Sequence, residues 1–324
     1  MSADEVALSR IQKLNVTLTD RDRLILSTLA TRRMLTTPQI AELAFDSPVT
    51  ARHRMQQLEA MQAVHRFRPR ADRGSYPSHF VLAPAGAAAV AIDAEEETKP
   101  AIRRARRDRE LGLKSPSRLR HLLGVNGFHT ALEAHARTHP DTEVERRLSE
   151  REMPDPGIHS HQARPDAVLT WREGDARSTV ALEYDTGTER LARLVDKIDR
   201  YAALLSLDPR AADGWEADEL FGHERPLVLF VFTTTRRATE ARAALERTST
   251  AVPIATGVWT PGTSPAETLW LPLNARPPRL RLAQLTPGAP SPFETGTTRA
   301  PGRARFDAPS AADAWFDVDE SDPW

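Results

Sequence analysis

The stretch from residue 164 to residue 201, RPDAVLTWREGDARSTVALEYDTGTERLARLVDKIDRY, determines the architecture of the second half of the chain. Its segments PDAVLTW and STVALEYD are rich in β-branched and aromatic residues and flank the polar turn REGDAR, so they predict two neighbouring strands. The segment TERLARLVDKIDRYAALL then carries apolar residues at helical spacing and predicts an amphipathic helix. Three acids, Asp166, Glu183 and Asp185, fall on the two strands, and Lys197 falls on the helix.

Working outward, the flanking segments extend this unit to the order helix, three strands, helix, strand. A long helix is predicted from Ser117, and TEVERRLSE is predicted as a strand that precedes the loop REMPDPGIHSHQA. PLVLFVFTTT predicts a buried strand, RRATEARAALERT a helix and VPIATGVW a further strand. This order predicts an α/β sandwich over residues 117–285.

The acids of the central stretch have the spacing of a metal-dependent nuclease site. Pro165-Asp166, followed by Glu183-Tyr184-Asp185, resembles the PD-(D/E)XK motif of the restriction-endonuclease-like fold. Alternate residues of a strand share one face, so Glu183 and Asp185 are expected to point the same way. If the hairpin brings Asp166 beside them, the three carboxylates would suit Mg²⁺ or Mn²⁺.

One position departs from that motif. Asp185 stands where the motif has its lysine, which would orient water and balance the phosphate charge. Lys197 on the following helix is the candidate replacement, and Glu189 is expected to reach the same pocket. Without a working lysine the domain would bind DNA but not cleave it.

The first part of the chain predicts a winged helix-turn-helix over residues 17–95. Thr19 and Asp22 predict a capping box at the start of one helix. Thr37-Pro38 and Ser47-Pro48 predict capped starts of two more helices. VHRFRPR and SHFVLA then predict a hairpin, the wing, which gives the two-domain α+β organisation of the whole chain.

In such a domain the third helix enters the major groove and the wing meets phosphates. The candidate DNA-binding residues are Thr50, Arg52, His53, Arg54 and Gln57 on the helix and Arg66, Arg68, Arg70 and Arg73 on the wing. The alternative is a winged helix used for homodimerisation, with solvated arginines. Double-stranded DNA is therefore the expected partner, and a homodimer stays open.

The remaining segments are expected to lie outside the two domains. Residues 1–16 are expected to be a flexible N-terminus, and the tail 286–324, dominated by Pro, Gly, Ser and Thr, is expected to be disordered. The linker 96–116 is basic and could lie along a helix that neutralises phosphates through Arg103, Arg104, Arg106, Arg107 and Arg109. Its alternative is an exposed connector held by salt bridges.

From about residue 15 to 260 the chain resembles the replication-relaxation family of actinobacterial plasmids and integrative elements. The segments that carry the resemblance are LTDRDRLILSTLATRRMLTTPQIAEL, HFVLAPAGAAAV, HLLGVNGFHTAL, RPDAVL and ALEYDTGTERLARLVDKIDRY. The resemblance implies action in plasmid replication or mobilisation, with a relationship to relaxases built on a nuclease fold. It also implies roles for Asp166, Glu183, Asp185, Glu189, Lys197, His121 and Asn126.

Other candidate nucleophiles and ligands carry less support. His159-Ser160-His161 has Ser where tyrosine relaxases have a hydrophobic residue, and it lies in a predicted loop. Tyr201 is an alternative nucleophile to metal-activated water, but a tyrosine on an amphipathic helix is more often a core residue. His121 and His129 lie on nearly one face of a helix, where packing histidines are commoner than ligands. The sequence has no phosphate loop or dinucleotide fingerprint.

Composition restricts the location of the protein but not its reaction. The 324 residues have a formal net charge of -1, contain no cysteine and include no apolar run long enough for a membrane span. We therefore expect a cytoplasmic protein with no membrane partner and, as further partners, other plasmid replication or transfer proteins. The preferred prediction is a metal-dependent DNA nickase of a mobile element. The alternatives are a catalytically inactive, sequence-specific DNA-binding regulator or transfer accessory, and a pure protein-interaction module.

Overall fold

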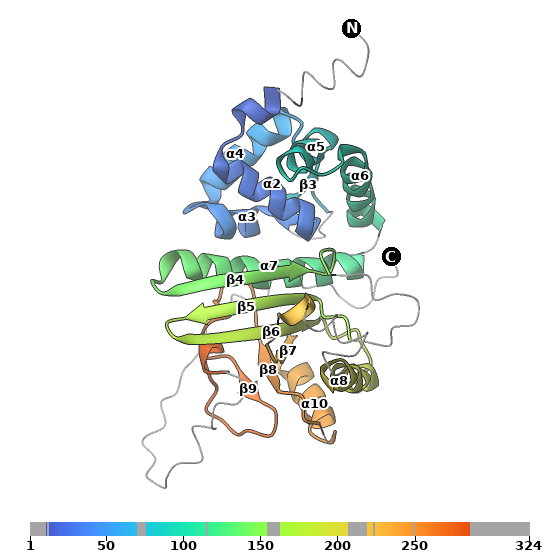
Figure 1. Cartoon of the computed structure of the whole chain (residues 1–324), viewed down its shortest axis with the longest axis vertical. Coiled ribbons are helices and arrows are strands. Elements are labelled where there is room, and N and C mark those ends of the chain that lie inside the picture. Colours follow the sequence, from blue (N-terminus) through green and yellow to red (C-terminus); the bar gives the residue numbers. More distant parts are fainter. Residues whose placement is uncertain are drawn as a thin grey trace.

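The computed structural model describes residues 11, 13–69, 76–114, 116–153, 163–206, 219–222, 224–248 and 250–285 of the chain. Several sequence predictions fall outside these residues, namely those for Arg70, Arg73, the triplet His159-Ser160-His161 and the tail 286–324. The described part is a mixed α/β structure in which an N-terminal helical part stacks on a larger part built around a mixed sheet (Figure 1).

The N-terminal part contains helices α2 (Asp20–Arg32), α3 (Thr37–Ala44), α4 (Pro48–Ala60) and α5 (Pro84–Asp93). Strands β1 (Leu35–Thr36), β2 (Val64–Phe67) and β3 (His79–Leu82) form an antiparallel sheet in the order β1-β3-β2. The predicted capping box of Thr19 and Asp22 is present. Thr36, rather than Thr37, caps α3. Its hydroxyl accepts a hydrogen bond from the backbone N–H of Gln39, and the Gln39 side-chain oxygen accepts one from the backbone N–H of Thr36.

The N-terminal core begins earlier than the sequence predicts and extends into the segment expected to be a linker. Leu14, in the segment expected to be flexible, is buried in this core. Helix α6 (Thr98–Lys114) occupies most of the predicted linker and packs through Ala101 and Ala105. Its buried Asp108 forms salt bridges with Arg33 and Arg151. Helix α6 is therefore docked on the rest of the molecule.

The second part is built on a six-stranded sheet among the described residues, in the order β4-β5-β6-β7-β8-β9. Strands β4 (Thr142–Ser149), β5 (Ala167–Glu173) and β6 (Ala176–Asp185) are antiparallel neighbours, as the polar turn REGDAR predicts. Strands β7 (Leu227–Phe232) and β8 (Ile254–Val258) continue the sheet parallel to β6, and the short β9 (Leu271–Pro272) closes the edge.

Helices cover both faces of this sheet, and each face has its own apolar core. Helix α7 (Pro116–Thr138) packs on one face together with Trp171, Trp259 and Trp270. Helices α8 (Leu191–Ser206) and α10 (Thr235–Leu245) pack on the other face. Because neighbouring residues of β6 alternate between the faces, Tyr184 belongs to the α7 core while Glu183 and Asp185 face α8 and α10.

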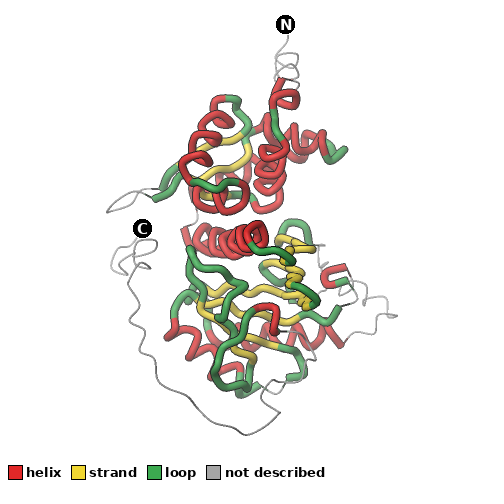
Figure 2. Tube along the Cα trace, turned by 90° about the vertical axis from the view of Figure 1, so that its left-hand side faces the viewer, coloured by secondary structure: helices red, strands yellow, loops and turns green. Residues whose placement is uncertain are grey.

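Helix α7 also joins the two parts, since it lies between the N-terminal helices and the sheet (Figure 2). The side-chain amide of Asn126 donates to the carbonyl oxygens of Arg32 and Met34, at 3.0 and 2.7 Å. The amide of Gln39 donates to the carbonyl of Leu123 at 2.7 Å. These bonds satisfy buried polar groups across the interface, so the position of the N-terminal part is fixed relative to the sheet. In the described part of the chain, no helix is long and apolar enough to cross a membrane.

Candidate functional site

Glu183 is the centre of a buried polar cluster between β6 and α8. Its side chain is only 2% exposed, and its Oε2 lies 2.7 Å from the Nζ of Lys197. Its Oε1 accepts a hydrogen bond of 2.7 Å from the hydroxyl of Tyr201. Lys197 also lies 3.2 Å from Glu189, which lies just before the same helix. The structure thus brings together three of the predicted site residues, Glu183, Lys197 and Glu189.

Helix α8 presents these partners because of its amphipathic spacing. Leu194, Ile198 and Tyr201 recur at intervals of four and three residues and are fully buried against the sheet. Lys197 lies at the rim of this face and is partly exposed, so its stem packs while its ammonium group reaches Glu183.

Asp166 lies just before β5 and is bound from two sides. Its Oδ2 accepts the backbone N–H of Tyr184 at 2.7 Å and lies 3.1 Å from the Nε2 of His121 on α7. His121, which the resemblance implied as a site residue, therefore lies against Asp166. Asn126 is different, because its side chain is buried and engaged with the N-terminal part, which makes it a structural residue.

Asp185 lies at the end of β6 and is bound to α10. Its Oδ2 accepts hydrogen bonds of 2.9 and 2.7 Å from the Nε and Nη2 of Arg237. Its Oδ1 accepts the backbone N–H of Gly187 at 2.5 Å. Arg237 also donates to the carbonyl of Glu189. Both carboxylate oxygens of Asp185 are therefore engaged within the protein.

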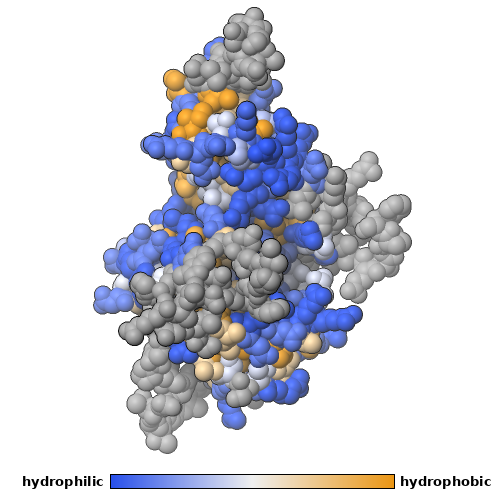
Figure 3. Space-filling view, turned by 45° about the vertical axis from the view of Figure 1, so that its right-hand side comes forward, coloured by the Kyte–Doolittle hydropathy of each residue, from blue (hydrophilic) through white to orange (hydrophobic). Residues whose placement is uncertain are grey.

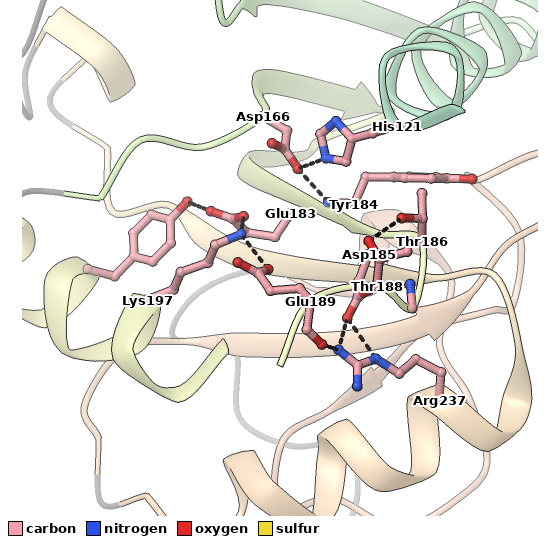
Figure 4. A network of polar contacts seen from close by, with 12 residues as sticks. His121, Asp166, Glu183, Tyr184, Asp185, Thr186, Thr188, Glu189, Lys197 and Arg237 are labelled. Atoms are coloured by element: carbon pink, nitrogen blue, oxygen red, sulfur yellow. Dashed lines mark hydrogen bonds and ion pairs between the residues drawn. The ribbon is translucent and has the colours of Figure 1, made fainter. Parts of the chain in front are cut away.

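The three predicted metal ligands diverge. Figure 4 shows Asp166 directed to His121, Glu183 to Lys197, and Asp185 to Arg237. The described residues contain no group of three or more His, Asp or Glu side chains that could hold a metal ion. A cradle formed by all three carboxylates does not fit this arrangement, because Arg237 already neutralises Asp185. The charge of Asp166 reaches Glu183, so these two carboxylates remain the candidate pair for a Mg²⁺ whose other ligands would be phosphate and water oxygens, although both Glu183 oxygens are bonded to Lys197 and Tyr201.

Burial and neighbouring charges shift the protonation of the cluster. Burial and the nearby Asp166 carboxylate raise the pKa of Glu183 to about 7, although Lys197 and Tyr201 oppose the shift. Burial alone would lower the pKa of Lys197, but the Glu183 and Asp166 carboxylates raise it above its ordinary value. Burial likewise lowers the pKa of His121, yet its hydrogen bond to Asp166 outweighs that effect and raises it. Charged forms of Lys197 and His121 are thus favoured beside the two acids.

Tyr201 orients the carboxylate of Glu183. Its side chain is fully buried in the core between the sheet and α8, and its hydroxyl is bonded to Glu183. Burial and the Glu183 charge raise its pKa well above the ordinary value. The hydroxyl of Tyr201 is therefore closed to solvent and occupied by Glu183.

The candidate DNA-reading residues of α4 fall into two groups. Thr50, Arg52 and His53 are exposed. Arg54 instead forms two hydrogen bonds, of 2.8 and 2.5 Å, with the buried Asp22 carboxylate, and it donates to Gln57 at 2.6 Å. Arg54 therefore holds α4 against α2, with Gln57 bonded to it, and the outward face is left to the other three residues.

The wing arginines within the described residues are only weakly engaged. Arg66 is 3.1 Å from Glu59, and both side chains are substantially exposed. Arg68 donates to the hydroxyl of Ser78 at 3.0 Å and is exposed. Exposed pairs of this kind contribute little to stability, so both guanidinium groups stay accessible to a phosphate.

Sequence reasoning missed Arg237 and Val49. Arg237 lies 52 residues beyond Asp185 and meets it only because α10 packs beside the end of β6, which no local pattern reveals. Val49 is 68% exposed at the start of α4, beside Thr50. Its position next to the predicted reading residues was the available signal, since exposed apolar side chains contact thymine methyl groups in major grooves.

Comparisons with known proteins give one match. No curated protein and no solved structure matches the chain. The model of the family described as replication-relaxation matches residues 26–214, which is more than half of the 324 residues. This range includes α4, α7, β5, β6 and α8, and hence the cluster of Asp166, Glu183 and Lys197. The chain therefore belongs to the replication-relaxation family.

Proposed function

We propose that this protein binds double-stranded DNA of a plasmid or integrative element and nicks one strand at the cluster of Asp166, Glu183 and Lys197. The observation that carries the proposal is the 2.7 Å contact of Lys197 with Glu183, next to Asp166 at the neighbouring strand. Membership of the replication-relaxation family indicates a role in plasmid replication or mobilisation.

The architecture supports a nuclease assignment of the second part. Asp166 lies just before β5, and Glu183 lies on the antiparallel neighbour β6, which then runs parallel to β7 after the helix α8. This is the arrangement expected of the PD-(D/E)XK fold, with the lysine moved from the strand to the following helix. We assign the role of the motif lysine to Lys197, because it contacts Glu183 while Asp185 at the motif position points to Arg237.

The residues of the cluster have separable tasks. A Mg²⁺ or Mn²⁺ ion held by Asp166 and Glu183 would activate water and stabilise charge on the phosphate. Lys197 supplies a positive charge for the anionic oxygens that develop during hydrolysis. Tyr201 fixes the orientation of Glu183 through its hydroxyl, and His121 and the N–H of Tyr184 fix that of Asp166.

The N-terminal part supports sequence reading by a winged helix-turn-helix. Helices α2, α3 and α4 are followed by the antiparallel hairpin β2-β3. We assign α4 to the major groove, with Thr50, Arg52 and His53 toward the bases, and Arg66 and Arg68 toward phosphates. The bonds of Arg54 to Asp22 fix the angle at which α4 is presented.

Supercoiled plasmid that carries the element's own replication origin tests the proposal. Wild-type protein with Mg²⁺ or Mn²⁺ is expected to convert it to open circles, whereas chelator, Asp166→Asn and Glu183→Gln should each abolish conversion. Arg236→Gln, a change of an exposed side chain on α10, is the matched control and should nick as wild type does. Equal amounts of closed circular DNA with wild type and Asp166→Asn would contradict the proposal.

The second candidate function is a regulator or transfer accessory that binds DNA without cleaving it. The observation that favours it is that both carboxylate oxygens of Glu183 are already bonded, one to Lys197 and one to Tyr201. A protein of this kind would bind its cognate duplex with equal affinity in metal and in chelator and would leave supercoiled plasmid closed.

A further inference from the structure

Helix α6 has a buried face and a basic face. Ala101, Ala105 and Asp108, at intervals of four and three residues, are buried against the rest of the molecule. The opposite face carries the exposed Arg103, Arg106 and Arg107. Figure 3 brings the right-hand side of Figure 1 forward and shows a hydrophilic surface over the right-hand area of the N-terminal part, next to an apolar patch at its upper left.

The arginines of this face are not used to stabilise the fold. Within the part of the chain that the structure describes, no ion pair joins Arg103, Arg106 or Arg107 to an acid. Glu110 lies on the same face and offsets one of their charges. Arg109, which is also exposed, lies near the wing, where its charge lowers the pKa of His65 after the larger effect of burial.

The buried acid of α6 fixes the arginines in space. Asp108 is only 3% exposed and lies 3.1 Å from the Nε of Arg33 and 2.5 Å from the Nη2 of Arg151. Arg33 follows α2, and Arg151 follows β4. Helix α6 is thus tied to both parts of the molecule at one point, and its exposed face cannot swing independently of either.

The same contacts lead toward the candidate nicking site. Arg33 and Arg151 line a small cavity whose wall also includes His121 and Asp166. The start of α7, between α6 and His121, exposes Arg118 and Arg120. Exposed guanidinium groups therefore occur on α6 and again at the start of α7, the helix that carries His121.

We infer that the exposed face of α6, with Arg103, Arg106 and Arg107, is a second DNA-contacting surface that binds the phosphate backbone of the duplex. The inference rests on the proposed function, because it takes duplex DNA as the occupant. Arg103 and Arg107 are about 6 Å apart along the helix axis, so several guanidinium groups meet consecutive phosphates. Arginine forks also match phosphate oxygens in pairs.

A duplex fits this surface better than an acidic protein segment does. Among the side chains of α6 and the start of α7 that the structure describes, no large apolar one is exposed, whereas stable protein interfaces need a desolvated apolar core. Contacts with phosphates position the duplex without reading its sequence. The α6 surface should therefore add affinity equally for every sequence, while α4 supplies discrimination.

Fluorescence anisotropy of labelled duplexes with the full chain tests the inference. The test variant is the triple change Arg103→Gln, Arg106→Gln and Arg107→Gln. The matched control is Arg236→Gln, Arg247→Gln and Arg276→Gln, which removes three exposed charges from the far part of the molecule. The test variant should bind cognate and scrambled duplexes about tenfold or more weakly, and its slope of log affinity against log salt should fall by about 2 to 3.

Each outcome has a defined meaning. If wild type and the control bind and the α6 variant binds equally well with an unchanged salt slope, the inference is wrong and the proposed function stands. If the α6 variant loses affinity for a poly-aspartate peptide but not for duplex, the surface binds an acidic protein and the inference is also wrong. If wild type binds no duplex, both the inference and the proposed function fail. Circular dichroism spectra that match wild type exclude misfolding of the variant.

Discussion

Gly124 on α7 lies against the ring of Tyr184 on β6, so closely that a Cβ built on the glycine would meet the Cε1 of the tyrosine at 2.1 Å. One turn earlier on the same helix, His121 reaches Asp166, which in turn accepts the backbone N–H of Tyr184. The absence of a side chain at residue 124 thus sets the distance between α7 and the sheet, and with it the contact of His121 with the acid.

Gly124→Ala should therefore destabilise the protein, although alanine favours helices. Overpacking of this kind costs about 1–3 kcal/mol of unfolding free energy, more than the roughly 1 kcal/mol that alanine gains over glycine in a helix. Urea denaturation would measure the difference. Adding Tyr184→Leu should restore part of the loss in a double-mutant cycle, whereas a single Gly124→Ala variant more stable than wild type would refute the tight contact.

Asn126→Ala should weaken the junction between the two parts of the molecule. The variant removes the side-chain donor of the Met34 carbonyl and one of two donors of the Arg32 carbonyl, which keeps the backbone N–H of Met34, and an unsatisfied buried acceptor costs about 1–3 kcal/mol. Hydrogen exchange should become faster at the end of α2. Thr138→Val is the control, since the Thr138 hydroxyl bonds only to its own helix and its neighbour His139 at an exposed position. Equal unfolding free energies for both variants would contradict this account.

Arg52 and Arg54 form a matched pair on α4 with opposite expected effects. Arg52→Ala should retain the stability of wild type and weaken binding to the cognate duplex, because Arg52 is exposed. Arg54→Ala should lower the unfolding free energy by about 1–3 kcal/mol, because it removes a partner of the buried Asp22 carboxylate. Thermal melts and duplex binding of both variants check the assignment. An Arg54→Ala protein that is as stable as wild type but loses its preference for the cognate duplex would show that Arg54, not Arg52, reads the DNA.

The pairing of His121 with Asp166 predicts a pH-dependent contribution to stability. The folded-state pKa of His121 is raised above the ordinary 6.5, so the folded protein holds the proton more tightly than the unfolded chain does. The stabilisation is fully present below pH 6.5 and is lost as the pH rises through the raised folded pKa. The difference in melting temperature between wild type and His121→Asn should therefore be larger at pH 5.5 than at pH 9. A difference that grows with pH would show that His121 is not protonated beside Asp166.

The sequence predicted the order of elements in the second part because each has a clear local signal. The alternating strands on either side of REGDAR and the spacing of Leu194, Ile198 and Tyr201 are such signals. It also predicted that Lys197 lies with Glu183, which follows from a helix that packs back on its own strand. The sequence could not predict the role of Arg237, because its contact with Asp185 depends on how α10 packs against β6.

Two other features show the same limit of local patterns. The basic run of residues 96–116 predicted exposure, but Ala101, Ala105 and Asp108 bury one side of α6, and the partners of Asp108 come from segments far away in the sequence. Arg54 is a residue type expected at a DNA contact, yet its guanidinium group forms a salt bridge with Asp22, 32 residues earlier. Charge partners that meet only in the tertiary structure decide which predicted site residues remain free.

The rate of nicking by Lys197→Met tests the central claim most directly. The measurement uses supercoiled plasmid with the cognate origin, saturating protein and Mn²⁺, and compares wild type, Lys197→Met and Lys197→Arg after duplex binding has been shown to be equal. The account predicts that Lys197→Met nicks about 100-fold or more slowly, as expected when one charge-stabilising group is removed, and that Lys197→Arg retains part of the rate. Nicking by Lys197→Met at the wild-type rate would contradict the assignment of Lys197, Glu183 and Asp166 as one hydrolytic site.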